Sequence, residues 1–157
     1  EVAPIIPDVR VTIAGNVDAG LRAQAPEEFS RFRQWFTGRI DDPGRIYACA
    51  RLVLLPTISG HGLSIKTIEA FSSGLPIVAT SLALRGLGAE AHMQDGVRVA
   101  DTADGFARAI RGVLQDKSRD PEARENSAAR DYYNRHFSQK AYETHLAELI
   151  FSLIQND

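Results

Sequence analysis

The stretch from Leu52 to Leu87, LVLLPTISGHGLSIKTIEAFSSGLPIVATSLALRGL, decides the fold of this chain. An apolar run is followed by a turn with glycines, a helical segment, and a second apolar run after a Gly-Leu-Pro break. Strand, loop and helix in this order bring backbone N–H groups to a helix start, where a phosphate can bind. Lys66 stands in or near the first helical turn, where the helix dipole disfavours a cation, and no Asp or Glu lies between Pro56 and Lys66. A bound anion would remove this conflict, so the stretch predicts an anion-binding turn.

The composition indicates one globular domain of common size. The chain has 157 residues, of which 44% are apolar and 24% charged, enough to bury a substantial core. Its net charge of −2 argues against a nucleic-acid binder that relies on a basic surface. Cys49 is the only cysteine, so no disulfide can form within the chain, and a reducing, cytoplasmic location is expected.

No part of the sequence resembles a targeting or membrane-spanning segment. Its apolar runs are all shorter than the ~20 residues that cross a bilayer, and the N-terminus has no signal-peptide pattern. Peripheral association with a membrane stays open. Because the chain begins Glu-Val-Ala-Pro and not with Met, we interpret it as a piece of a longer protein.

Predicted strands and helices alternate along the chain. The short apolar or β-branched runs predict strands at residues 10–14, 34–37, 52–55, 77–80 and 97–100. Cap residues, prolines and apolar spacing predict helices at residues 26–33, 41–48, 64–73, 103–114, 121–135 and 139–154. Strands joined by helices imply right-handed crossovers and a parallel sheet. We therefore predict a doubly wound α/β domain over residues 1–157, with a core at 8–116 and C-terminal helices at 117–157.

Several motifs in order resemble one enzyme family. The quoted stretch contains Gly60-x-Gly62-x-x-x-Lys66, then Glu69-Ala70, then Gly-Leu-Pro-Ile-Val-Ala-Thr at 74–80 and Arg-Gly-Leu at 85–87. The flanks agree at Trp-Phe-Thr-Gly-Arg (35–39), Ile-Tyr-x-x-Ala (46–50), Asp-Gly (95–96) and the helix around Phe106. Over residues 8–116 the chain resembles the donor-binding domain of GT-B fold retaining glycosyltransferases of family 4, or group 1.

The resemblance implies a role for each matching residue. Lys66 would contact the diphosphate of a UDP- or GDP-linked sugar donor, with backbone N–H groups of Gly62 and Leu63 beside it. Glu69 would accept hydrogen bonds from the ribose hydroxyls, since a carboxylate can take two neighbouring hydroxyls. No cofactor or metal is implied beyond the donor itself. The predicted catalytic residue is Lys66, and the predicted donor-binding residues are Gly15, Asn16, Gly60, His61, Gly62, Leu63, Ser64, Lys66, Glu69 and Thr80, with Ser81 beside Thr80 at the floor of the cleft.

This chain departs from the family pattern in three ways. Some members carry an acid eight residues before Glu69, where this chain has His61, which puts the sugar-contacting role in question. The strand and helix that open the family's domain, with their basic pair, do not precede the Arg10 strand. The N-terminal acceptor-binding domain is absent too, so we expect the chain alone to be inactive and that domain to be its partner. The missing strand would leave an open edge or force direct pairing of strands 10–14 and 52–55, and an open edge favours self-association.

Other interpretations of the same residues stay open. Lys66 and Glu69 have the spacing of an exposed helical ion pair, and Gly60 and Gly62 could be ordinary turn glycines. Arg85 fits either a phosphate contact or a solvated loop residue. A dinucleotide-binding oxidoreductase is disfavoured, because Ile65 occupies the third small position of that fingerprint. A non-catalytic flavodoxin-like module that binds a nucleotide or a partner is the remaining alternative.

Overall fold

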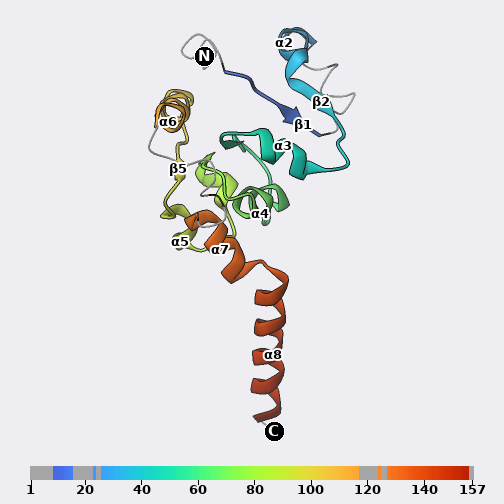
Figure 1. Cartoon of the computed structure of the whole chain (residues 1–157), viewed down its shortest axis with the longest axis vertical. Helices are drawn as coiled ribbons and strands as arrows, with labels where there is room; N and C mark the ends of the chain where they lie inside the picture. Colours follow the sequence, from blue (N-terminus) through green and yellow to red (C-terminus); the bar gives the residue numbers. More distant parts are fainter. Residues whose placement is uncertain (1–8, 16–22, 24–25, 117–123, 125–126, 156–157) are drawn as a thin grey trace. The chain divides into compact units, whose positions relative to one another are not determined.

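The computed structural model describes residues 9–15, 23, 26–116, 124 and 127–155. The chain divides into two compact units, residues 1–48 and 49–157 (Figure 1). Each unit has its own sheet and is described by itself. A single domain over residues 1–157 stays a prediction.

The first unit contains a two-stranded parallel sheet and short helices. Its elements are β1 (Ile13–Ala14), α2 (Pro26–Phe32), η1 (Arg33–Trp35), β2 (Phe36–Gly38) and α3 (Pro43–Cys49), which ends at the unit boundary. Ile13 of β1 lies opposite Phe36 of β2. Pro26 and Pro43 occupy the first position of their helices, where a missing N–H costs nothing. The strands predicted at 10–14 and 34–37 therefore form, but in shorter versions.

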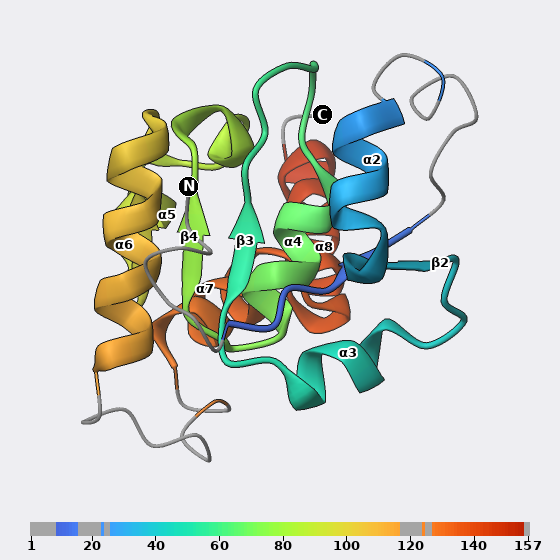
Figure 2. The ribbon, with the colours of Figure 1, turned by 90° about the horizontal axis from the view of Figure 1, so that it is seen from above.

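The second unit is built on a three-stranded parallel sheet in the order β3-β4-β5. Its elements are β3 (Val53–Leu55), α4 (Ile65–Ser72), β4 (Ile77–Ala79), η2 (Ser81–Leu84), α5 (Ala89–His92), β5 (Val97–Val99), α6 (Ala103–Gln115), α7 (Ala128–His136) and α8 (Gln139–Gln155). Val53 pairs with Ile77, and Ile77 pairs with Val97. Figure 2 shows β3 and β4 running in the same direction. Their carboxyl ends therefore lie at one edge of the sheet.

The central strand and its helices supply the core of this unit. All three residues of β4 are buried, as expected for a strand covered on both faces. Helix α6 packs against β4 and β5, while α4 packs against α7. Phe71 of α4 is fully buried, and its ring centroid lies 5.2 Å from that of Tyr132 in α7. Burying one such ring stabilises the fold by about 2 kcal/mol, so the α4–α7 contact is a large contribution to stability. The α/β class with parallel sheets is confirmed.

Gly74 ends α4 and allows the chain to turn toward β4. It follows the C-cap Ser73 and has a φ of +68°, a left-handed conformation that favours glycine. A Cβ at this position would overlap the carbonyl oxygen of Arg124. The Arg124 guanidinium in turn donates to the carbonyl oxygen of Ala50 at 2.9 Å. Gly74 therefore lets the segment before α7 pass against the end of α4.

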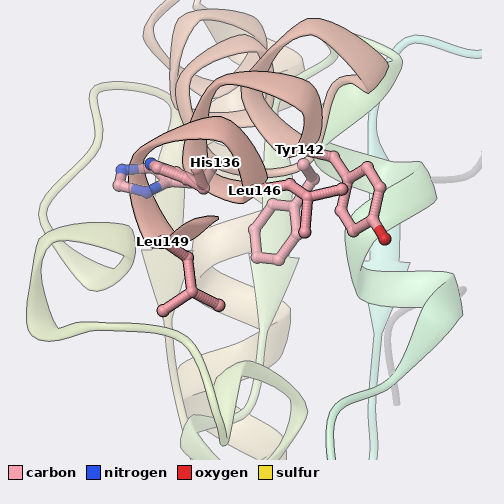
Figure 3. A pocket seen from close by; sticks show the side chains of 6 residues that line it. His136, Tyr142, Leu146 and Leu149 are labelled. Carbon is pink, nitrogen blue, oxygen red and sulfur yellow. The ribbon is translucent and has the colours of Figure 1, made fainter. Parts of the chain in front are cut away.

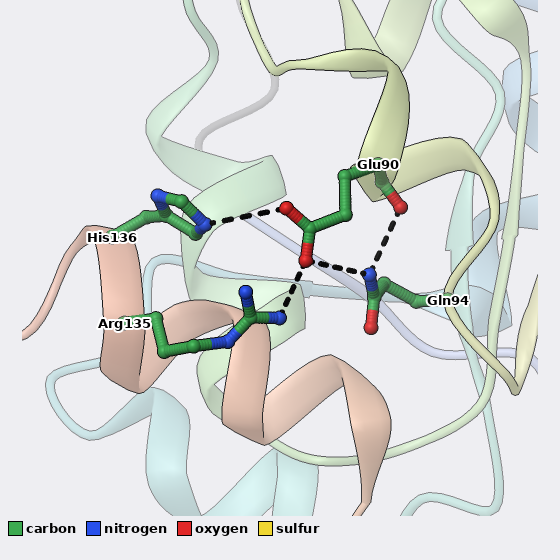
Figure 4. Close-up of polar contacts among 4 residues, drawn as sticks. All are labelled: Glu90, Gln94, Arg135 and His136. Carbon is green, nitrogen blue, oxygen red and sulfur yellow. Dashed lines mark hydrogen bonds and ion pairs between the residues drawn. The ribbon is translucent and has the colours of Figure 1, made fainter.

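Two residues of α7 connect it to α5 through one carboxylate. Arg135 lies 2.6 Å from Glu90 through Nη2 and Oε1, and His136 lies 3.7 Å from the second oxygen (Figure 4). Gln94 also donates to the backbone carbonyl of Glu90 at 2.9 Å. The hydrogen bond from Arg135 holds the pKa of the Glu90 carboxyl below its usual range, and the nearby positive charges act in the same direction. This carboxylate therefore joins α5 to α7 through an ion pair with Arg135.

Helix α8 exposes a large apolar surface. Only Ala141 of this helix is buried, whereas the apolar side chains beyond it are 41 to 69% exposed: Tyr142, Leu146, Leu149, Ile150, Phe151, Leu153 and Ile154. The stripe predicted as a packing face has no cover in the part of the chain that the structure describes. Residues at the α7–α8 junction line a hollow of about 360 Å³ (Figure 3): His136, Phe137, Tyr142, His145, Leu146 and Leu149. No helix among the described residues is long and apolar enough to span a membrane.

The structure also differs from the prediction in several places. The helix expected from Pro121 begins at Ala128, because the Ser127 hydroxyl caps it by accepting from the Arg130 N–H at 3.2 Å. Residues 121–123 lie outside the described residues. Neither η2 nor α5 was expected. In the described residues the parallel strands form two sheets, β1-β2 and β3-β4-β5.

Replacing Gly74 with alanine should destabilise the protein by at least ~2 kcal/mol, because the left-handed conformation and the overlap with Arg124 both oppose a Cβ. Gly112, inside α6, is a matched control because a Cβ there meets no atom within 4 Å. Gly112→Ala should stabilise the helix by about 0.5–1 kcal/mol. Urea denaturation of both variants measures the difference, and equal effects would contradict the role of Gly74.

The free edge of β3 leads to a second expectation. Among the described residues β3 pairs only with β4. The Val53 N–H and the Leu55 carbonyl both form their hydrogen bonds on the side of β4. Leu54 therefore points its N–H and C=O to the other side. We expect self-association that rises with concentration and weakens in Leu54→Pro, which removes the outward N–H. Light scattering that gives one 17.2 kDa species at every concentration would contradict it.

Candidate functional site

The turn between β3 and α4 lies at the carboxyl edge of the sheet. Two of its glycines, Gly60 at φ +120° and Gly62 at φ +70°, have conformations that few other residues adopt. The turn is exposed from Ser59 to Leu63. In parallel α/β sheets, ligands bind at this edge, so the predicted anion-binding turn lies where a ligand site is expected.

The turn presents backbone N–H groups without partners. Within the described residues, the N–H groups of residues 62–66 donate to no protein atom. Ser64 occupies the N-cap position of α4 in an extended conformation, but its side chain makes no capping bond to the described chain. Its carbonyl oxygen accepts from Thr67 N–H at 3.0 Å. The start of α4 therefore has the unpaired donors and the positive dipole end that an anion requires.

Lys66 and Glu69 are both exposed on α4. Neither takes part in an ion pair or side-chain hydrogen bond with any described residue. The helical ion pair that their spacing allowed is therefore not formed. Lys66 stands in the first turn of α4 with no acid in that turn, so its charge is unbalanced there.

Two buried threonines hold the floor of this turn. The Thr80 hydroxyl donates to the Thr57 carbonyl at 2.7 Å and accepts from Ala83 N–H at 3.2 Å. The fully buried Thr67 hydroxyl donates to the Ala83 carbonyl at 2.7 Å. Beside them, Ser81 donates to Asp101 Oδ1 from its N–H at 2.7 Å and from its hydroxyl at 2.9 Å. Thr80 thus contacts the β3–α4 segment at Thr57 with a hydroxyl engaged on both sides, whereas Ser81 bonds to Asp101.

Sequence reasoning did not identify Thr67 and Asp101. A polar residue on the buried face of α4, beside Ala70 and Phe71, was a usable signal for Thr67 because a buried hydroxyl needs a partner. Asp101 follows β5, at the edge of the sheet where the Thr80–Ser81 pair also stands. Polar residues after parallel strands meet at that edge.

Arg85 connects η2 to the glycine turn. Its guanidinium donates to the Leu82 carbonyl at 2.7 Å and to the His61 carbonyl at 3.2 Å. A Cβ at Gly60 would lie 3.1 Å from Arg85 Nη2. Neither sequence interpretation, a phosphate contact or a solvated loop residue, included this bond to the backbone of the turn.

The remaining predicted residues belong to the first unit or face solvent. Gly15 follows β1 with a φ of +140° and donates to the Gly38 carbonyl at 2.9 Å. Asn16 lies outside the described residues. The side chain of His61 is exposed. The structure therefore groups residues 60–69 and Thr80, while Gly15 belongs to the other unit.

Two hollows among the described residues are lined by other residues than those of this turn. One is the α7–α8 hollow of Figure 3, and the other, of about 490 Å³, is lined by Ile40, Asp41, Asp42, Arg45 and Ile46. Neither includes Lys66 or Glu69. Unpaired donors and charges, not concavity, distinguish the glycine turn. In the described part of the chain, His, Cys, Asp and Glu side chains form no group of three that could hold a metal ion.

Comparison with known proteins gives one family and several relatives. The family described as "Glycosyl transferases group 1" matches residues 1–116. Phosphatidyl-myo-inositol mannosyltransferase of Mycolicibacterium smegmatis is 35% identical over 114 residues, which cover 70% of this chain and 29% of that protein. Sucrose-phosphate synthase of Thermosynechococcus elongatus aligns with a TM-score of 0.73 at 17% identity, over 99% of this chain and 41% of that one. A crystal structure of Anabaena HepE in complex with UDP aligns with a TM-score of 0.67 at 19% identity, over 90% and 41%. This chain thus spans less than half of each relative.

Proposed function

The chain belongs to the group 1 glycosyl transferases, and we propose that its glycine turn and α4 bind the diphosphate and ribose of a nucleotide-sugar donor. One observation carries the proposal: the N–H groups of residues 62–66 and the Lys66 ammonium stand at one helix start, without partners among the described residues. Backbone donors, a helix dipole and an ammonium group together suit a diphosphate. The UDP in the HepE structure supports a nucleoside diphosphate as the ligand.

The ribose contact is proposed for Glu69. It is exposed on α4, one turn beyond Lys66, and no described residue occupies its carboxylate. A free carboxylate can accept hydrogen bonds from both vicinal hydroxyls of a ribose. This spacing would put the pentose next to the diphosphate, in the order in which a nucleotide carries them.

The reaction that we propose is hexosyl transfer with retention of configuration. The bond between the sugar's anomeric carbon and the phosphate oxygen breaks, and a bond forms between that carbon and an acceptor hydroxyl oxygen, whose proton passes to the departing diphosphate. Negative charge grows on the departing diphosphate, and the Lys66 ammonium and turn N–H groups stabilise it there. The match to group 1 and the mannosyltransferase relative support glycosyl transfer.

Another part of the enzyme would supply the binding site for the acceptor. The chain covers 29% of the mannosyltransferase and 41% of each solved neighbour. We expect an acceptor-binding domain to complete the cleft above the exposed glycine turn. The chain alone would then bind donor without transferring its sugar.

Binding of nucleoside diphosphates tests the donor site directly. UDP or GDP, or their sugars, should raise the melting temperature of the chain, whereas NADH should not. A ligand at 100 times its Kd stabilises a protein by about 2.7 kcal/mol, a rise of several degrees. Thermal-shift measurements check this effect. The rise should be smaller in Lys66→Ala and unchanged in Lys140→Ala, the exposed control on α8. If none of these nucleotides raises the melting temperature, the proposed donor site is contradicted.

Lys66→Ala in the intact enzyme should lower kcat by about 10²-fold or more, because a charge contact to the leaving group is lost. Glu69→Gln should mainly raise the donor KM, because the amide keeps only one acceptor oxygen for the ribose. Steady-state kinetics with donor and acceptor varied separately distinguish these effects, with Glu148→Gln as the exposed helical control. An unchanged rate for Lys66→Ala, or a Glu69→Gln effect confined to the acceptor KM, contradicts the assigned role.

A further inference from the structure

We propose that Arg85 is a positioning residue that fixes the direction of the Gly62 N–H group in the turn. This inference rests on the proposed donor site, because the N–H that it orients is one of the donors to the diphosphate. It concerns a side chain outside the turn and outside α4. The contact runs through the backbone of His61.

The guanidinium is fixed at its own end of the contact. Arg85 follows η2, in which Ala83 and Leu84 are fully buried. Its Nη1 donates to the Leu82 carbonyl at 2.7 Å, and its Nε is buried without a hydrogen-bond partner among the described residues. A side chain that starts from a buried turn and bonds back to that turn has little freedom. The second nitrogen, Nη2, is therefore presented to the His61 carbonyl from a stable base.

Peptide geometry transmits this contact to Gly62. The carbonyl of His61 and the N–H of Gly62 belong to one planar peptide group, and no described peptide bond is cis. In a trans peptide these two groups point in opposite directions. Because the His61 oxygen bonds to Arg85 at 3.2 Å, the Gly62 N–H points away from Arg85. Within the described residues the Gly62 N–H has no hydrogen-bond partner.

The turn needs such a contact because glycines flank the peptide. Gly60 and Gly62 both have positive φ angles, of 120° and 70°, and glycine also populates many other conformations. Without a bond to the His61 carbonyl, the peptide between His61 and Gly62 could rotate and turn its N–H elsewhere. A preorganised donor costs less to use than one that must be ordered on binding.

Gly60 and Gly86 leave room for the contact between Arg85 and the turn. A Cβ at Gly60 would lie 3.1 Å from Arg85 Nη2, and a Cβ at Gly86 would lie 3.4 Å from Leu63 Cβ. The Arg85–Gly86 segment thus approaches the turn at two successive points. No described carboxylate pairs with Arg85. A lysine could not replace it fully, because only the planar guanidinium can donate to two carbonyls in a fixed geometry.

The test compares Arg85→Met and Arg85→Lys with Arg108→Met, an exposed arginine on α6 that is remote in sequence from the turn. Calorimetric titration of the 157-residue chain with UDP and with GDP gives the affinities. Spectra of chain labelled with ¹⁵N-glycine report the Gly62 amide before any ligand is added. We expect Arg85→Met to weaken nucleotide binding about tenfold, as loss of an oriented hydrogen bond to a charged group does. Arg85→Lys should fall between wild type and Arg85→Met, and Arg108→Met should match wild type.

The Gly62 amide signal separates positioning from a purely structural role. In ligand-free Arg85→Met it should shift or broaden, while Gly112 in α6 keeps its wild-type position. If Arg85→Met proves too unstable, Arg85→Lys carries the same comparison at a smaller amplitude. Wild-type affinity in a folded Arg85→Met, or an unshifted Gly62 amide, overturns the role of Arg85 and leaves the donor site standing. A wild-type chain that binds neither UDP nor GDP overturns the donor site itself, and with it this inference.

Discussion

The hydrogen bond from the buried Thr67 hydroxyl to the Ala83 carbonyl, 2.7 Å long, holds the helix that carries Lys66 against the turn that follows β4. A buried hydroxyl without a partner is costly, so this bond constrains α4 and η2 to one relative position. Thr80, the other buried polar residue among the described core positions, holds the same turn to Thr57 at 2.7 Å. Parallel pairing of β3 with β4 brings these segments to one edge, and the threonines fix them there. The geometry of the glycine turn depends on both.

Much of this arrangement could be predicted from the sequence, because its signals are local. The apolar runs before Pro56 and after Pro76 are strands, and Gly74 ends α4 where the Gly-Leu-Pro break stands. Pairings between distant residues could not be predicted. The bond from Arg85 to His61 joins residues 24 apart through a backbone atom, which leaves no trace in residue type. The start of α7 was predicted at the wrong residue for a different reason. Pro121 and Ser127 both offer helix-start signals, and only the structure shows that Ser127 caps the helix.

The start of α4 lacks the groups that usually balance the positive end of a helix dipole. An acid in the first turn of α4 would satisfy the helix dipole, and a capping bond from Ser64 would satisfy one N–H, but neither is present in the described structure. Lys66 adds a cation where the dipole is already positive. In the same unit, by contrast, the Glu90 carboxylate is paired with Arg135 at 2.6 Å. An anion bound at the turn would balance both the Lys66 ammonium and the positive end of the α4 dipole.

The backbone and the side chain of His61 have different surroundings. The His61 carbonyl accepts from Arg85 at 3.2 Å, whereas its side chain is exposed. The direction of the Gly62 N–H therefore depends on main-chain atoms that every residue type provides. Replacing His61 with another residue should therefore leave the direction of the Gly62 N–H unchanged. In the proposed donor site, the orientation of that N–H would then depend on Arg85, Gly60 and Gly62 and not on the residue type at position 61.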